Sequence, residues 1–458
     1  MHSQLSRLFT ALQAAGVEWS LLRLPRDLDL PPGDVDLLVR PDDLAAFRAV
    51  AVSCGFAGLP GWQEWPTLQY FALDRSAARF VALDVTDRVA FGSSGELPTD
   101  LADGVLRRRV RNGDLYTPCP DDAFWLLLLH CLLDKGHVPE HYRERLQSGA
   151  GQAECSGELG RAVDAVLTTS PLDAAALRDL AAAGDWPGLT GAAGPLRAAW
   201  QDALGRRGRA GVRRAQVRRA VTRPALYRQR RGLSVALLGT NGAGKSTLAE
   251  GIVGSFPLPV SRVYMGLWKL ADSDPSVARQ AVEVAFRPFR AWRRYLGALC
   301  LQARGHLVVF DRYVYDARRP PRPPLVLAKR LYFWLLSHAV GTPDLTILLD
   351  LPGAVAFGRK GEDGLAETEQ ERQEFLALGS QLDLRIVDAT RTADEVRSDV
   401  LTLIWEATRA RWAGRDTSPR DRNGDVPAGV GVSGRTAAGS ASPAPRSTVE
   451  TPDPSSLA

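Results

Sequence analysis

A nine-residue segment between an apolar run and a helix-forming run constrains the fold of this chain most strongly. Residues 233–238 (LSVALL) are typical of a buried parallel strand. They lead into Gly239-Thr-Asn-Gly-Ala-Gly-Lys-Ser-Thr247, which has the pattern GxxxxGK[ST]. Glycines let such a loop wrap closely around a phosphate group, and the backbone amides then point at that phosphate. The segment therefore predicts a strand, a phosphate-binding loop (P-loop) and a helix.

The side chains of this loop are expected to bind a nucleotide and its metal ion. Lys245 supplies a positive charge to the β- and γ-phosphates, and Ser246 offers its hydroxyl to Mg²⁺. We assign nucleotide binding to Gly239, Asn241, Gly242, Gly244, Lys245, Ser246 and Thr247.

Three further predicted strands are each followed by an aspartate. The apolar run 307–310 precedes Asp311 and the apolar run 345–349 precedes Asp350, and a further predicted strand, 384–387 (LRIV), precedes Asp388. An aspartate that ends a strand next to a P-loop is used to hold Mg²⁺, directly or through water, although such a residue can also only cap the strand. Helical segments separate the runs, so we expect an α/β fold with a parallel sheet and helices on both faces.

These motifs, in this order, resemble the thymidylate kinase family of nucleoside monophosphate kinases over residues 233–410. The resemblance implies phosphoryl transfer from ATP, with Mg²⁺, to a nucleoside monophosphate or a related acceptor. Besides the P-loop it is carried by four segments: Asp311-Arg312-Tyr313, Pro343-Asp344-Leu345-Thr346, Arg359-Lys360-Gly361-Glu362 and Val387-Asp388-Ala389.

The resemblance also implies roles for individual residues. Lys245 and Mg²⁺ bound to Ser246 would hold the donor, whereas Asp311 and Arg312 would orient the acceptor phosphate and the water molecules of the metal ion. Arg359 would close over the transferred group as part of a lid, unless it is a solvated basic turn. Asp388 lies where that family contacts the adenine of ATP.

The sequence departs from that family where the acceptor base is read. Asn241 replaces a residue that is acidic in many thymidylate kinases, and residues 264–269 (YMGLWK) replace an expected Arg-Glu-Pro-Gly segment. Residues 316–324 replace the base-reading segment. The phosphate-binding motifs are thus better preserved than the thymine-reading ones.

The N-terminal half carries a second set of acidic residues. Asp34 and Asp36 open a predicted strand and point to the same face, and Asp84 closes another apolar run. Paired carboxylates on one face suit a two-metal nucleotidyl transfer site. The pattern resembles the DNA polymerase beta-like nucleotidyltransferase superfamily over about residues 1–145, which implies metal binding by these three aspartates. The Gly-Ser pair of that superfamily is missing at 21–25 (LLRLP), so a domain that binds without catalysis stays an alternative.

Composition divides the chain of 458 residues further. Its formal charge of +5 hides an acidic N-terminal part and a segment, 206–231, with eleven arginines and no acidic residue. That segment contains one aromatic residue, Tyr227, so a linker or interdomain contact is favoured over nucleic-acid binding.

The predicted layout is an α+β nucleotidyltransferase-like domain with a helical extension (1–205), an arginine-rich linker (206–231), a P-loop domain (232–413) and a disordered tail (414–458).

The remaining expectations concern location and partners. No apolar run approaches the ~20 residues of a membrane span, and no signal peptide precedes the first amphipathic helix. Five scattered cysteines without a CxxC pair indicate a cytoplasmic protein. The kinase resemblance implies small-molecule nucleotide substrates. It also implies a homodimer, although the extra domain could block dimer formation. Two other functions stay open, a nucleic-acid end-processing enzyme and a non-catalytic nucleotide-binding regulator.

Overall fold

The computed structural model describes most of the first 413 residues. The described residues are 1–29, 31, 33–60, 67–92, 95–168, 172–205, 209–210, 212–214, 216–217, 231–265, 277–315, 331, 334–335, 340–360 and 364–413. The predicted tail, most of the predicted linker and the segment 316–324 lie outside them. No helix of the described part is long and apolar enough to cross a membrane.

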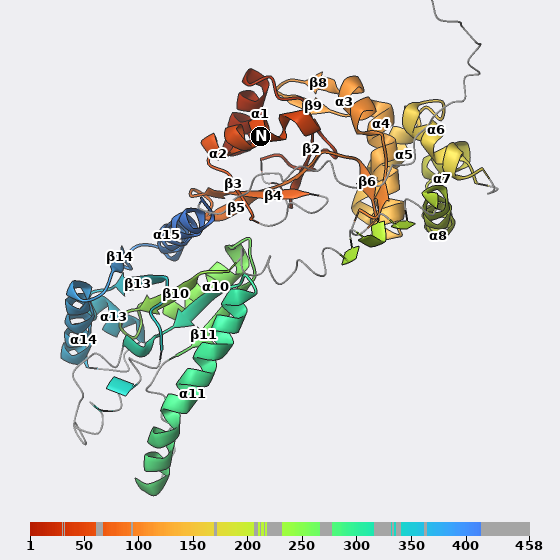
Figure 1. Ribbon diagram of the computed structural model, residues 1–458. Coiled ribbons are helices and arrows are strands. Elements are labelled where there is room, and N and C mark those ends of the chain that lie inside the picture. Colours follow the sequence, from red (N-terminus) through yellow and green to blue (C-terminus); the bar gives the residue numbers. More distant parts are fainter. Residues whose placement is uncertain are drawn as a thin grey trace, which may run out of the picture.

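The C-terminal half is built on a sheet of five parallel strands, four of which correspond to strands predicted from the sequence (Figure 1). The strand order is β11-β12-β10-β13-β14, so the strand before the P-loop is central. The strands are β10 (Ser234–Leu238), β11 (Val260–Tyr264), β12 (Leu307–Asp311), β13 (Leu345–Asp350) and β14 (Leu384–Asp388).

Helices cover both faces of this sheet because alternate strand residues point to opposite sides. Val235 and Leu237 pack with α10 (Lys245–Ser255) and α15 (Ala393–Ala413). Ala236 and Leu238 pack with the other helix layer, α11 (Val277–Ala303) and α14 (Leu365–Ala377). A short helix, α13 (Gly353–Lys360), precedes α14, and the 3-10 turn Leu378–Ser380 follows it. The predicted α/β fold is thereby confirmed.

The N-terminal half contains a mixed sheet in the order β1-β2-β5-β4-β3. Strands β2 and β5 are parallel, and the other pairs are antiparallel. Helices α1 (Ser3–Ala14) and α2 (Leu44–Ser53) pack on one face through a shared apolar core. The strands are β1 (Trp19–Leu21), β2 (Val35–Val39), β3 (Ala57–Gly58), β4 (Leu68–Asp74) and β5 (Arg79–Thr86).

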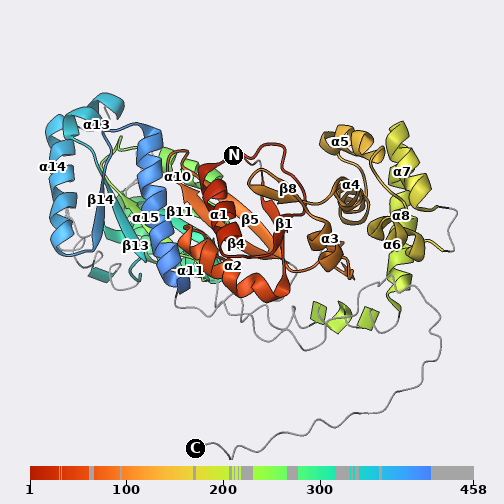
Figure 2. The same cartoon turned by 90° about the horizontal axis from the view of Figure 1, so that it is seen from above.

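Helices extend this half away from the sheet, with α7 and α8 at one end of the molecule and α13 and α14 at the other (Figure 2). They bury a core of their own, centred on α4 and α8. The elements are β6 (Ala90–Phe91), β7 (Leu97–Pro98), α3 (Ala102–Arg108), β8 (Val110–Asn112), β9 (Leu115–Thr117), α4 (Pro120–Leu129), the π-helix His130–Lys135, α5 (Glu140–Ala150), α6 (Glu158–Val166), α7 (Ala174–Ala183) and α8 (Trp186–Ala203).

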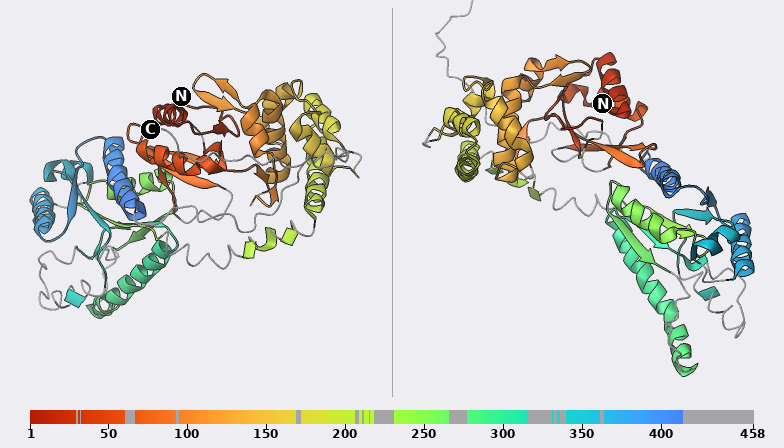
Figure 3. Two further views of the ribbon diagram at one scale, coloured as in Figure 1. Left: turned by 45° about the horizontal axis from the view of Figure 1, so that its top comes forward. Right: turned by 180° about the vertical axis from the view of Figure 1, so that it is seen from behind.

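The second face of the N-terminal sheet rests on α15 of the C-terminal half (Figure 1 and Figure 3). Phe80 of β5 packs edge-on against Trp405, with ring centroids 5.0 Å apart, and against Phe256 at 5.4 Å. Residues of β4 and β5 thus belong to the same apolar cluster as α10 and α15. Aromatic and aliphatic side chains thus hold the two halves together.

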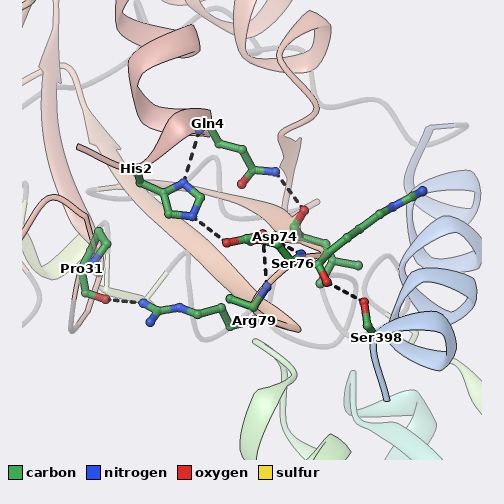
Figure 4. Close-up of polar contacts among 10 residues, drawn as sticks. His2, Gln4, Pro31, Asp74, Ser76, Arg79 and Ser398 are labelled. Atoms are coloured by element: carbon green, nitrogen blue, oxygen red, sulfur yellow. Dashed lines mark hydrogen bonds and ion pairs between the residues drawn. The ribbon is translucent and has the colours of Figure 1, made fainter. Parts of the chain in front are cut away.

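Polar contacts at the β4–β5 turn surround this apolar contact (Figure 4). The Ser398 hydroxyl of α15 donates to the Arg75 carbonyl over 2.6 Å, and the Arg75 guanidinium lies 3.0 Å from Glu406. On the other side of the turn, His2 Nε2 lies 2.9 Å from Asp74. The turn therefore connects the start of the chain to its last described helix.

Candidate functional site

The P-loop lies at the carboxyl end of the central strand β10. The strand order reverses direction there, which is where open α/β sheets bind ligands. Gly242 has a φ of +86°, and a Cβ atom on it would lie 2.8 Å from the Ala356 carbonyl of α13. Only glycine therefore fits between the loop and α13.

Lys245 is buried under the loop at the start of α10. Its ammonium donates to the carbonyls of Gly239 and Thr240 over 2.8 and 2.7 Å. The hydroxyl of Thr240 is buried nearby without a hydrogen-bond partner. Removing these polar groups from water is costly unless they are paired, so the loop is suited to an anionic ligand that accepts hydrogen bonds.

The structure brings two predicted Mg²⁺ ligands together. The Ser246 hydroxyl donates to Asp311 Oδ2 over 3.1 Å, and the Asp311 side chain is buried at the end of β12. Mg²⁺ prefers oxygen ligands, so this pair fits the ion. Thr247 follows in the first turn of α10 and is exposed.

Arg262 is a site residue that the sequence analysis missed. Its guanidinium, on strand β11, is paired with Asp311 Oδ2 and also lies 3.2 Å from Glu250. Strand β11 is hydrogen-bonded to β12. In this ladder Asp311 lies opposite Tyr264, and Arg262 is two residues before Tyr264. The hydrogen bond to Asp311 holds the pKa of Arg262 above its usual value.

Arg312 adopts an uncommon backbone conformation beside the loop. Its φ is +64°, in the left-handed region that costs a residue with a side chain of the order of 1–2 kcal/mol. The guanidinium donates to the side-chain oxygen of Asn241. Strained residues persist where surrounding structure fixes them, often at functional sites, and here the strain places a cation next to the P-loop.

The predicted lid and adenine residues meet at the end of β14. Arg359 of α13 is exposed, and its guanidinium lies 3.5 Å from the Ala389 carbonyl. Asp388 accepts hydrogen bonds from the hydroxyl and the amide of Thr390 over 2.7 and 2.9 Å, and these bonds lower the pKa of Asp388. Asp388 thus shapes a turn, and its predicted contact with adenine stays a prediction.

The three N-terminal aspartates lie near one another on or beside the sheet. Asp36 of β2 and Asp84 of β5 are neighbours in the parallel ladder, and the residues on either side of each, such as Leu37 and Leu83, face α1 and α2. Burial, followed by the charges of Asp34 and Asp36, raises the pKa of Asp84 to about 6. One oxygen of Asp84 is buried without a hydrogen-bond partner.

Arg23, which the sequence analysis did not single out, binds Asp36 with both ends of its guanidinium. The Nη2–Oδ1 distance is 2.8 Å and the Nε–Oδ2 distance is 3.1 Å. Among the described residues, no group of three or more His, Cys, Asp or Glu side chains is arranged to hold a metal ion. The metal role of Asp34, Asp36 and Asp84 therefore stays a prediction.

No protein-family model and no curated protein sequence matches the chain. Among solved structures, it is similar to a thymidylate kinase from Candida albicans, with 20% identity, a TM-score of 0.30 and coverage of 39% of this chain and 93% of that chain. It is also similar to a deoxyadenosine kinase from M. mycoides solved with bound dATP, with 14% identity, a TM-score of 0.29 and coverage of 38% and 99%. At these identities the likeness concerns the fold and not the substrate.

Proposed function

We propose that the C-terminal half transfers the γ-phosphoryl group of ATP, bound with Mg²⁺, to a nucleoside monophosphate or a related phosphorylated acceptor. One observation carries the proposal. The Ser246 hydroxyl and the Asp311 carboxylate meet at 3.1 Å beside the buried Lys245 ammonium, at the carboxyl end of the central parallel strand.

Phosphoryl transfer requires charge neutralisation and alignment of the reacting oxygens rather than covalent chemistry by the protein. Lys245 would exchange its two loop carbonyls for the β- and γ-phosphate oxygens of the donor. Ser246 and Asp311 would hold Mg²⁺, which neutralises phosphate charge when bound. Lys245, Ser246 and Asp311 all lie at the carboxyl ends of the neighbouring parallel strands β10 and β12, so one phosphate chain could reach all three groups.

Cations next to the loop would serve the acceptor. Arg312 is held at Asn241, beside the phosphate-binding amides, and would orient the acceptor phosphate. Arg359 is exposed on α13, which also packs against Gly242, and would cover the transferred group. Arg262, on strand β11, would have a different role. Its guanidinium would neutralise Asp311 until a metal ion binds.

The test is ADP release by the purified full-length protein with MgATP and a panel of acceptors. The panel contains nucleoside monophosphates, small phosphorylated metabolites and polynucleotide ends. We expect at least one small phosphorylated acceptor to stimulate ADP release, and Lys245→Ala to lower the stimulated rate about 100-fold, as loss of charged hydrogen bonds worth about 3 kcal/mol implies.

Lys135→Ala is the matched control, because Lys135 is an exposed lysine in the N-terminal half and should leave the rate unchanged. If no small acceptor raises ADP release above that with ATP alone, the proposal is wrong. Transfer to polynucleotide ends alone would favour end processing, and ATP binding without turnover would favour a regulator.

A further inference from the structure

The N-terminal carboxylate cluster already contains a cation that the chain itself supplies. Arg23 approaches Asp36 with two of its nitrogen atoms and engages both carboxylate oxygens. An arginine fork matches a carboxylate in this bidentate way, and its guanidinium does not lose its proton in proteins. Asp36 is therefore neutralised by a permanent charge on the face where the other two aspartates lie.

We infer that Arg23 takes the place of a metal ion in this cluster, so that the N-terminal half does not bind a divalent cation at Asp34, Asp36 and Asp84. A divalent cation at Asp36 would have to displace the guanidinium or accept a positive charge beside it, and like charges repel strongly at such short range. The three aspartates therefore do not fit the metal site that their resemblance implies.

Hydrogen bonds on both sides of Arg23 fix the backbone segment that carries its side chain. The Leu22 amide donates to the Asp36 carbonyl over 3.0 Å. On the other side, Arg145 donates to the Leu24 carbonyl over 2.6 Å, and Arg26 donates to the His141 carbonyl over 2.9 Å. The segment is thus fixed between strand β2 and the helical extension.

The charges and the burial around the Arg23 guanidinium strengthen its pairing with acidic side chains. Burial of the guanidinium acts to lower the pKa of Arg23, but the charges of Asp36 and of Asp134 in the π-helix outweigh burial and raise this pKa. The side chains of Arg23 and Asp36 are only 26% and 22% exposed, so water screens the pair weakly. Moving Arg23 away would leave the half-buried carboxylates of Asp36 and Asp134 without this cation.

The experiment measures Mn²⁺ binding by electron paramagnetic resonance on full-length protein that is free of nucleotide and treated with EDTA. We expect the wild type and Asp84→Asn to bind the same amount of Mn²⁺. Arg23→Gln should gain one site that is at least about 10-fold tighter than any wild-type site. The double variant Arg23→Gln/Asp84→Asn should lose it again.

Arg26→Gln is the matched control, because Arg26 lies in the same segment but donates to a backbone carbonyl. It should gain no site. A wild-type Mn²⁺ site that disappears in Asp84→Asn would overturn the inference, and so would a folded Arg23→Gln protein that binds no more Mn²⁺ than the wild type. If Arg23→Gln fails to fold, the comparison of wild type with Asp84→Asn decides by itself.

Discussion

Replacing Asp84 by asparagine should stabilise the protein at neutral pH and have a smaller effect in acid. The Asp84 side chain lies on β5 with one oxygen buried and without a hydrogen-bond partner. Burial and the neighbouring charges of Asp34 and Asp36 raise its pKa from 3.8 to about 6, against a hydrogen bond with Gln69. The folded protein therefore holds a proton on Asp84 more tightly than the unfolded chain does.

The sign of the effect follows from this difference in proton binding. The stability linked to Asp84 is fully present below pH about 4 and is lost as the pH rises through about 6. A pKa difference of about two units corresponds to at most about 3 kcal/mol at pH 8, of which about 1.4 kcal/mol is lost between pH 5 and pH 8. An asparagine carries no charge, so Asp84→Asn should escape this loss.

The assay is urea denaturation of full-length protein in metal-free buffer at about pH 5 and pH 8, where the unfolding free energy is extrapolated to water. The gain of Asp84→Asn over wild type should be larger at the higher pH by about 1 kcal/mol. Asp42→Asn, at a side chain that is 89% exposed, should show no such difference. A gain that is equal at both pH values, or a loss at pH 8, would refute the reasoning.

Three further substitutions test the site and the contact between the halves. Gly242→Ala should weaken ATP binding about 10-fold, measured by equilibrium titration, because its φ of +86° and the nearby Ala356 carbonyl leave no room for a Cβ atom. Arg262→Leu should lower the Mg²⁺ concentration needed for half-maximal ATP binding, since it frees Asp311; an unchanged requirement would contradict this. Phe80→Ala should lower the unfolding free energy by about 2 kcal/mol and separate the melting of the two halves in calorimetry.

Local sequence patterns were sufficient to predict the strands that carry the aspartates of both sites. The runs ending at Asp311 and Asp350 became β12 and β13, because a buried parallel strand requires a continuous apolar run. The segment ending at Asp388 became the edge strand β14, in which Arg385 and Ile386 are exposed. The alternation of side chains along a strand likewise places Asp36 on the face of β2 away from Val35, Leu37 and Val39. These features depend on neighbours within a few residues.

The arginines that bind these aspartates could not be predicted in the same way. Arg262 is 49 residues from Asp311 in the sequence, and the two meet only because β11 is hydrogen-bonded to β12. Arg372 of α14 similarly binds Asp350 with two nitrogens, at 2.6 and 3.0 Å. Register between strands and helix placement decide such pairs, and a single sequence does not reveal either.

The two halves pair an arginine with a strand aspartate in different ways, and the difference bears on where metal chemistry takes place. Arg262 shares its charge between Asp311 and the largely exposed Glu250, so it retains a partner when it leaves Asp311. Arg23 engages both oxygens of Asp36 and lies in a segment fixed by backbone hydrogen bonds. A metal ion bound with a phosphate chain at the P-loop would therefore displace the first arginine at a lower cost than a metal ion at Asp36 would displace the second. The two proposals together assign Mg²⁺ binding to the C-terminal half, whose helix α15 packs on the N-terminal sheet.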